Sequence, residues 1–111
     1  MFDHVTIRVA DRAASRAFYT LALGEPGHAS VYVEWDDFSL LEGPDVARNL
    51  HVAFGVENRA AVDAWWRALV EAGYTSDGEP GPRPEYSDAY YGGFVLDPDG
   101  HNVEAVFHDR S

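Results

Sequence analysis

Two histidines and one glutamate have the residue types and the strand positions of a metal site. His4 and His51 each open a segment of alternating apolar character, and Glu104 interrupts the apolar run NVEAVF. Neutral imidazole nitrogens and a carboxylate oxygen suit a divalent ion such as Fe, Mn, Ni or Zn, and leave positions open for water or substrate. The alternative is that these residues are ordinary polar side chains on a solvated sheet face. Spacing alone does not decide between the two.

The elements that must position these residues occur twice in the chain. The segment HVTIRVADRAASRAFY, from His4, aligns without gaps with HVAFGVENRAAVDAWW, from His51, at an offset of 47 residues. Each copy begins with strand-like alternation, passes through a good helix N-cap, Asp11 or Asn58, and continues with helical spacing up to a glycine. The sequence therefore predicts a strand followed by a helix in each half.

Further strands are expected after each helix. The first half contains SVYVEW and FSLLEG, with room for two strands, and the second contains GGFVL and HNVEAVFH around an Asp-Pro-Asp-Gly turn. The segment SDGEPGPRPEYSD, from Ser76 to Asp88, is rich in Gly and Pro, which predicts a loop and a candidate ligand lid. This pattern indicates an α+β fold with a mainly antiparallel sheet. A doubly wound sheet would need helices between the later strands.

Alternation along the strands assigns the side chains to two faces. The face toward the helices is expected to carry Val5, Ile7, Val9, Val52, Phe54, Val103, Ala105 and Phe107. His4, His51 and Glu104 then lie on the opposite face, and Arg8 lies there beside His4. The three candidate ligands are therefore predicted on one concave side, with Arg8 as a candidate substrate contact.

Length and composition limit the classes of function. The chain has 111 residues, of which 46% are hydrophobic, and this indicates a single domain over residues 1–111. The absence of Cys excludes a cysteine nucleophile or a thiolate metal site. A net charge of -11 argues against nucleic acid or an anionic membrane as a partner. No signal peptide or membrane-spanning segment is recognisable, so a cytoplasmic location is expected.

Three segments, FDHVTIRVADRAASRAFY, LHVAF and YYGGFVLDPDGHNVEAVFH, resemble the vicinal oxygen chelate superfamily, the glyoxalase/bleomycin resistance protein/dioxygenase family. The resemblance covers nearly the whole chain. It implies two βαβββ-type modules, 1–45 and 49–109, whose sheets curl into a cup with the helices on the convex side; the first module is shortened here. It also implies His4, His51 and Glu104 as metal ligands. Ser39 stands where many members carry a fourth ligand, Glu or Gln.

Two functions follow from this resemblance. The first is a metal-dependent lyase, isomerase or oxygenase that acts on a small substrate chelating the ion through two oxygens. Glyoxalase I itself is disfavoured because the fourth ligand is missing. The alternative is a non-catalytic protein that binds and sequesters a cationic drug, which the negative charge and the aromatic residues favour. Members usually assemble as dimers, so a homodimer is expected.

Further candidate contacts to a substrate lie outside the ligand set. They are Arg8, Arg83, Tyr86, Tyr91 and His101. Arg83 and Tyr86 belong to the Pro-rich segment, and His101 follows the Asp-Pro-Asp-Gly turn, where it is either an acid/base group or a turn residue. An arginine on the concave face would favour an anionic substrate even in a chain of negative total charge.

Overall fold

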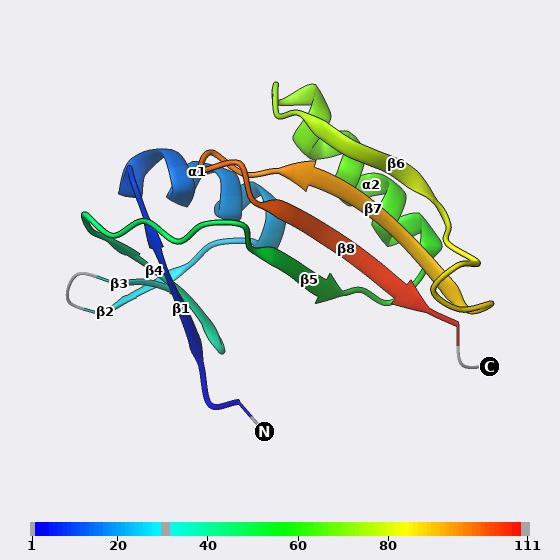
Figure 1. Ribbon diagram of the computed structural model, residues 1–111, viewed down its shortest axis with the longest axis horizontal. Helices are drawn as coiled ribbons and strands as arrows, with labels where there is room; N and C mark the ends of the chain where they lie inside the picture. Colours follow the sequence, from blue (N-terminus) through cyan, green and yellow to red (C-terminus); the bar gives the residue numbers. More distant parts are fainter. Residues whose placement is uncertain (1, 30–31, 110–111) are drawn as a thin grey trace. The chain divides into compact units, whose positions relative to one another are not determined.

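The structure, a computed structural model, describes residues 2–29 and 32–109. The chain divides into two compact units, Met1–Arg48 and Asn49–Ser111. Each unit contains one helix and one four-stranded sheet, in the order strand, helix, three strands (Figure 1). The elements of the first unit are β1 (Val5–Val9), α1 (Arg12–Leu23), β2 (Gly27–Ala29), β3 (Tyr32–Trp35) and β4 (Phe38–Glu42). Those of the second are β5 (His51–Gly55), α2 (Arg59–Glu71), β6 (Ser76–Pro82), β7 (Tyr90–Leu96) and β8 (Asn102–His108).

The two sheets have the same strand order, β1-β4-β3-β2 and β5-β8-β7-β6. In each sheet the first and last strands pair in parallel, and the other neighbours pair antiparallel. The predicted α+β class with mainly antiparallel pairing is therefore confirmed. The parallel pair is the feature that matters for the site, because it brings β5 and β8 side by side although they lie far apart in the sequence.

The first unit has three strands after its helix, and the prediction of two was wrong. The additional strand, β2, has only three residues and pairs antiparallel with β3. A segment of that length that begins with glycine carries too little alternation to be recognised from the sequence. The first unit is shortened in the length of its strands: those after the helix have three, four and five residues, against seven in each of β6, β7 and β8.

The segment Ser76–Pro82, predicted as part of a loop, is strand β6. It lies at one edge of the second sheet and pairs with β7, with register shifts between Ser76 and Gly78 and between Gly78 and Gly81. An edge strand needs hydrogen bonds on one side only, so its prolines leave no gap in a ladder, and bulges absorb the irregular pairing. Residues 83–89 alone form the connection to β7.

Both helices begin at the predicted caps. Oδ1 of Asp11 accepts a hydrogen bond from the backbone N–H of Ala14 at 3.1 Å, and Oδ1 of Asn58 accepts one from Ala61 at 2.7 Å. Such caps contribute about 1 kcal/mol each. The helix α1 is followed by Gly24, whose φ of 99° favours glycine. Within the described part of the chain, no helix is long and apolar enough to cross a membrane.

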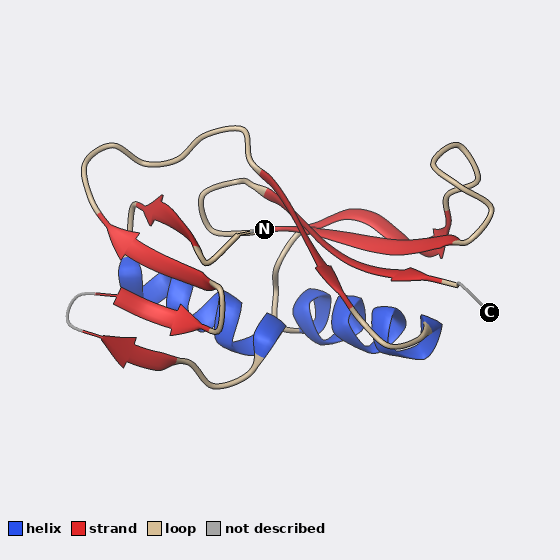
Figure 2. Ribbon diagram, turned by 90° about the horizontal axis from the view of Figure 1, so that it is seen from below, coloured by secondary structure: helices blue, strands red, loops and turns tan. Residues whose placement is uncertain are grey.

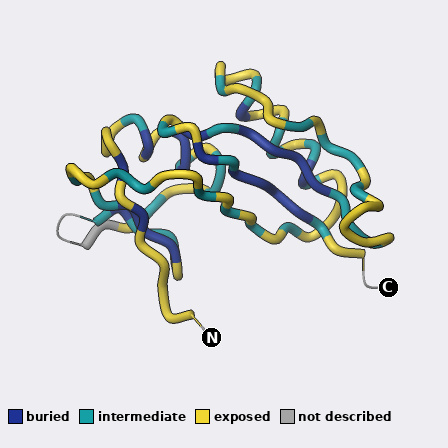
Figure 3. The backbone as a smooth tube through the Cα atoms, in the orientation of Figure 1, coloured by how far each residue is buried: buried dark blue, intermediate teal, exposed yellow. Residues whose placement is uncertain are grey.

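In each unit the helix covers one face of its own sheet (Figure 2). The buried apolar residues of the first unit are Ile7, Val9, Phe18, Tyr19, Val33, Phe38 and Leu40. Those of the second are Val62, Leu69, Phe94, Val95, Val103, Ala105 and Val106. Figure 3 shows that burial in the second unit is concentrated along β7 and β8, whereas β5 and β6 are more exposed. The two central strands therefore provide a rigid base for side chains on the other face of the sheet.

Candidate metal and ligand site

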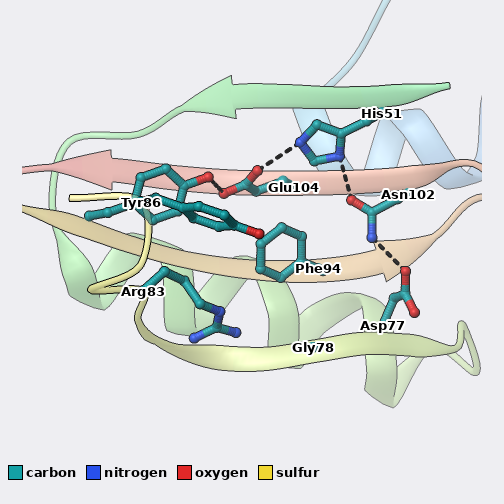
Figure 4. A pocket seen from close by; sticks show the side chains of 9 residues that line it. His51, Asp77, Gly78, Arg83, Tyr86, Phe94, Asn102 and Glu104 are labelled. Carbon is teal, nitrogen blue, oxygen red and sulfur yellow. Dashed lines mark hydrogen bonds and ion pairs between the residues drawn. The ribbon is translucent and has the colours of Figure 1, made fainter.

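A cavity of about 720 Å³ lies on the face of the second sheet that α2 does not cover (Figure 4). All four strands and the connection between β6 and β7 contribute to it. Its polar lining consists of His51, Asp77, Arg83, Asn102 and Glu104, and its aromatic lining of Tyr86, Tyr90 and Phe94. This volume is in the range of small-molecule sites, and a few convergent polar groups beside aromatic walls are typical of them.

Two of the three predicted metal ligands meet in this cavity. In the parallel pair β5–β8, His51 lies opposite Asn102, and Ala53 lies opposite Glu104. The side chains of His51 and Glu104 project to the same face, and Nε2 of His51 lies 3.0 Å from Oε1 of Glu104. The Glu104 side chain is 1% exposed, so its charge is almost completely removed from solvent.

A chain of polar contacts fixes the imidazole of His51 (Figure 4). Nδ2 of Asn102 donates to Oδ2 of Asp77 at 2.5 Å, and a carboxylate can only accept. The amide oxygen of Asn102 therefore faces His51 and lies 2.5 Å from its Nδ1. Because that oxygen also only accepts, Nδ1 must carry the hydrogen. In the neutral imidazole, Nε2 then presents its lone pair to Glu104.

The carboxylate of Glu104 is satisfied on one oxygen only. Oε2 accepts a hydrogen bond from the phenol of Tyr90. Oε1 has no hydrogen-bond partner among the described residues, so its 3.0 Å contact with His51 does not have hydrogen-bond geometry. A buried carboxylate oxygen that faces a nitrogen lone pair is unfavourable unless a cation compensates the charge.

A divalent ion fits this pair of donor atoms. Two donor atoms that each lie about 2.1 Å from the same ion are about 3.0 Å apart when their bonds to the ion form about a right angle. The nitrogen of His51 and the oxygen of Glu104 have this separation. One imidazole nitrogen and one carboxylate oxygen suit Fe, Mn, Ni or Zn. Within residues 2–29 and 32–109, however, no three His, Asp or Glu side chains gather around a common point. The pair would therefore be completed by water, by substrate oxygens or by a further ligand.

Gly92 makes room for the hydrogen bond that holds Glu104. A Cβ at this position would lie 2.6 Å from Oε2 of Glu104 and 3.1 Å from Cε1 of Tyr90. Burial, followed by the hydrogen bond to Glu104, raises the pKa of Tyr90 well above its ordinary value. The phenol therefore stays protonated at neutral pH and keeps donating to the carboxylate.

His4, the third predicted ligand, belongs to the first unit. Its side chain is largely exposed, its Nδ1 lies 2.8 Å from Oδ1 of Asp3, and it lines a separate cavity of about 370 Å³ in that unit. Its role as a ligand stays a prediction.

Ser39 occupies the place in the first sheet that Glu104 occupies in the second. It lies opposite Thr6 in the parallel pair β1–β4, as Glu104 lies opposite Ala53 in β5–β8. The hydroxyls of Ser39 and Thr6 are hydrogen-bonded at 2.7 Å. The last strand of the first unit therefore carries a satisfied hydroxyl at this position in place of a carboxylate.

Of the predicted substrate contacts, Arg83 and Tyr86 line the same cavity as His51 and Glu104. Tyr91 follows Tyr90 on β7 and points the other way, toward α2, where its hydroxyl donates to Oδ1 of Asp63 at 2.7 Å. Whether any of these residues contacts a substrate stays a prediction.

The other two predicted contacts are not among the residues that line this cavity. His101 is buried in the turn before β8: its Nδ1 accepts from the backbone N–H of Leu50 at 3.4 Å, and its Nε2 has no hydrogen-bond partner among the described residues. Arg8 is exposed on β1 in the first unit, where its side chain lies beside Gly43. Their proposed roles also stay predictions.

Several lining residues were not singled out from the sequence, among them Asn102, Phe94 and Asp77. Asn102 could have been, because it lies two residues before Glu104 on the same strand face. Phe94 lies opposite Glu104 in the hairpin β7–β8. This register could have been predicted by counting residues along both strands from the Asp-Pro-Asp-Gly turn. No sequence pattern indicated Asp77 as a site residue, because its strand was predicted as a loop.

The fold and the site define a class of protein built from two βαβββ modules, with a cavity on the open face of a mixed sheet. The sequence matches the Glyoxalase/Bleomycin resistance protein/Dioxygenase superfamily over residues 1–105, and the chain belongs to this superfamily. No curated protein matches the sequence.

Solved structures share the fold over nearly the whole chain. A glyoxalase/bleomycin resistance protein from Albidiferax ferrireducens T118 is 24% identical, with a TM-score of 0.81, over 97% of this chain and 99% of that one. A glyoxalase/bleomycin resistance protein/dioxygenase family enzyme from Burkholderia phytofirmans PsJN is 17% identical, with a TM-score of 0.76, over 96% and 97%. The oxidase ChaP-H2 is 23% identical, with a TM-score of 0.71, over 97% and 93%. At these identities the likeness concerns the fold.

Proposed function

We propose that this protein is a divalent-metal-dependent enzyme that carries out lyase, isomerase or oxygenase chemistry on a small chelating molecule. The ion is held by His51 and Glu104, with His4 as a further ligand. The observation that supports this most directly is Oε1 of Glu104, which is buried, lacks a hydrogen-bond partner among the described residues and faces Nε2 of His51. A cation is the group that satisfies both atoms.

A divalent ion bound there supplies Lewis acidity to the oxygens of the ligand. The residues around it have separate tasks. Asn102, held by Asp77, keeps the hydrogen of His51 on Nδ1, so that Nε2 is free to coordinate. Tyr90 keeps its proton against Oε2 of Glu104, so that Oε1 is the oxygen presented to the cavity.

Metal titration tests the proposal. The protein is stripped of metal, and Fe(II), Mn(II), Ni(II) and Zn(II) are titrated by calorimetry into the native chain, Glu104→Gln and His51→Ala. We expect one ion per chain and at least about tenfold weaker binding in both variants. Glu57→Gln is the matched control, because Glu57 is exposed and does not line the cavity. Metal binding that is absent, or that is indifferent to Glu104 and His51, would refute the proposal.

Two further variants separate the roles of individual residues. Asn102→Leu removes the acceptor for Nδ1 of His51 without touching a coordinating atom, and we expect metal affinity to fall by about 10- to 100-fold. His4→Ala tests the predicted third ligand: an unchanged affinity would remove His4 from the set while leaving the other two.

A non-catalytic binder of cationic drugs is the second candidate. It is favoured by the two carboxylates of the cavity, Asp77 and Glu104, beside three aromatic rings. The two functions differ in what metal does to binding. A sequestering protein would bind benzyltrimethylammonium in the absence of metal and lose this affinity in Glu104→Gln. A metal-dependent enzyme would show no such binding once it is loaded with metal.

The assembly and the location of the protein are part of the same proposal. We expect a homodimer, as the family resemblance implies, and we keep the cytoplasmic location that is expected from the sequence. Light scattering on the purified protein measures the mass of the assembly, and a monomeric mass at micromolar concentration would contradict the first expectation.

A further inference from the structure

Arg83 stands out among the charged residues of the cavity because no carboxylate pairs with it. The two carboxylates of the cavity make other contacts: Asp77 accepts from Asn102, and Oε2 of Glu104 accepts from Tyr90. No ion pair to Arg83 occurs among the described residues. Its positive charge is therefore available to a ligand.

Backbone carbonyls and an aromatic ring hold the guanidinium in place. Nη2 of Arg83 donates to the carbonyl of Glu79 at 2.6 Å, and Nη1 donates to that of Pro82 at 3.2 Å. Its Cζ lies 5.2 Å from the centre of the Phe94 ring. These contacts use one hydrogen on each of two nitrogens and leave the other N–H groups without a protein partner in the described part of the chain. A fixed arginine with free donors is organised in advance for an anion.

The glycines of β6 provide the space that this arrangement needs. A Cβ on Gly81 would lie 3.2 Å from Nη1 of Arg83. A Cβ on Gly78 would lie 3.5 Å from Nη2 of Arg83 and 2.8 Å from Cδ2 of Phe94. A larger residue at Gly81 would press on the guanidinium, and one at Gly78 would press on the Phe94 ring over which the guanidinium lies. The sequence DGEPGPR therefore forms a cradle for Arg83 at the wall of the cavity.

Phe94 connects Arg83 to the proposed metal pair. It lies opposite Glu104 in the hairpin β7–β8, and its ring is 6.2 Å from that of His51 and 5.2 Å from Cζ of Arg83 (Figure 4). Tyr86 packs edge-on against Tyr90 at 4.9 Å and adds a second aromatic surface. A ligand that extends from His51 and Glu104 to Arg83 must cross this aromatic surface.

We propose that the ligand of this cavity is a planar, unsaturated molecule with chelating oxygens at one end and a carboxylate at the other, and that Arg83 binds the carboxylate. This inference rests on the proposed function for the chelating end only. The carboxylate end depends on the fixed guanidinium, and it is favoured further by a bound divalent ion, which would offset the charges of Asp77 and Glu104.

A matched pair of probes tests the carboxylate end. The probes are 3,4-dihydroxybenzoate and its neutral amide, which share the two vicinal oxygens and differ in charge at the opposite end. Both are titrated into Zn(II)-loaded and metal-free protein. For the Zn(II)-loaded native chain we expect the carboxylate to bind about tenfold more tightly than the amide. In Arg83→Gln this preference disappears, while the affinities for the amide and for Zn(II) are unchanged.

Arg59→Gln is the matched control. Arg59 also lies over a tyrosine ring, with Cζ 5.3 Å from the centre of Tyr91, but it does not line the cavity. We expect it to retain the full preference for the carboxylate. Arg83→Lys, which keeps the charge but not the planar fork, should retain a reduced preference, and it serves as the test if Arg83→Gln does not fold.

The outcomes separate this inference from the proposed function. In one outcome Zn(II) does not bind, but the metal-free protein still prefers the carboxylate probe and Arg83→Gln removes that preference. The metal proposal is then refuted, whereas the binding of a carboxylate by Arg83 is supported. If Zn(II) binds but the two probes bind equally, or Arg83→Gln changes nothing, the role of Arg83 is overturned. Failure of both probes to bind overturns it as well.

Discussion

Glu104 is an ionisable side chain in an otherwise apolar strand, and its surroundings explain its position. Burial of a carboxylate costs several kcal/mol even after the protein relaxes around it. One oxygen is compensated by the Tyr90 phenol, whereas the other faces His51 without a hydrogen bond from any described residue. Buried polar side-chain atoms are normally hydrogen-bonded. The half-satisfied carboxylate is therefore the strongest single indication of a cation site in this chain.

Gly92→Ala should disrupt this site from the opposite strand. The added methyl group would lie 2.6 Å from Oε2 of Glu104, where a real contact cannot exist without movement of the carboxylate. We expect a loss of about 1–3 kcal/mol in the free energy of unfolding, measured by urea denaturation, together with weaker metal binding.

Gly55→Ala is the control for this substitution. Gly55 lies on β5 of the same sheet, and a Cβ there meets no atom within 4 Å. We expect its stability to stay within about 0.5 kcal/mol of the native chain. Equal stability of Gly92→Ala and Gly55→Ala would show that Gly92 is not required for the position of Glu104.

At the scale of elements, β7 serves both faces of the second sheet. Tyr90 points into the cavity and donates to Glu104, while the next residue, Tyr91, points toward α2 and donates to Asp63. Successive residues of a strand face opposite ways, so one strand connects the site to the helix that supports the sheet.

The contact between β7 and α2 should make stability depend on pH in the alkaline range. The hydrogen bond to Asp63, followed by burial, raises the pKa of Tyr91 above its ordinary value of 10.0. The folded state therefore holds this proton more tightly than the unfolded state, so the contribution is complete below about pH 10 and is lost as the pH rises through the folded-state pKa. We expect Tyr91→Phe to be about 0.5–1 kcal/mol less stable than the native chain at about pH 8, and this gap to be smaller at about pH 11.

Urea denaturation of the native chain and of Tyr91→Phe at the two pH values measures this gap. Tyr86→Phe is the control, because the Tyr86 side chain is exposed and does not contact α2 through Asp63. A stability difference for Tyr91→Phe that is the same at both pH values would contradict the assigned hydrogen bond.

At the scale of the whole molecule, one supersecondary unit is used twice with different outcomes. Both units have the same strand order and the same parallel pairing of first and last strands. At equivalent positions the first carries the hydrogen-bonded hydroxyl of Ser39, and the second carries the carboxylate of Glu104. The duplicated fold thus supplies two similar sheet faces, of which the second concentrates the groups that suit a cation.

We predict that the two units unfold together as one domain. The first unit has 48 residues, which is marginal for an isolated core. Each unit has its own fluorescent reporter, Trp35 in the first and Trp65 with Trp66 in the second. Urea unfolding is followed by fluorescence and far-ultraviolet circular dichroism in Trp35→Phe and in the double variant of Trp65 and Trp66. In each variant the two signals should give the same midpoint; separate midpoints would indicate two independent domains.

The sequence by itself determined the internal repeat, the helices with their caps at Asp11 and Asn58, and the α+β class. These features depend on local periodicity and on single side-chain hydrogen bonds, which are encoded within a few residues. Strand alternation also placed His51 and Glu104 on the same face of their strands, because the period of a strand is fixed by its backbone.

Only the tertiary structure decided how these groups meet. The parallel pairing of β5 with β8 joins residues 51 positions apart in the chain, such as Ala53 and Glu104, and its register sets the 3.0 Å contact of His51 with Glu104. The edge strand β6 could not be predicted, because Gly and Pro normally interrupt a strand, and their tolerance here depends on having a partner on one side only. Asp77 and the cradle of Arg83 are parts of that strand. Pairing between distant segments is a property of the whole sheet, and no local pattern in the sequence encodes it.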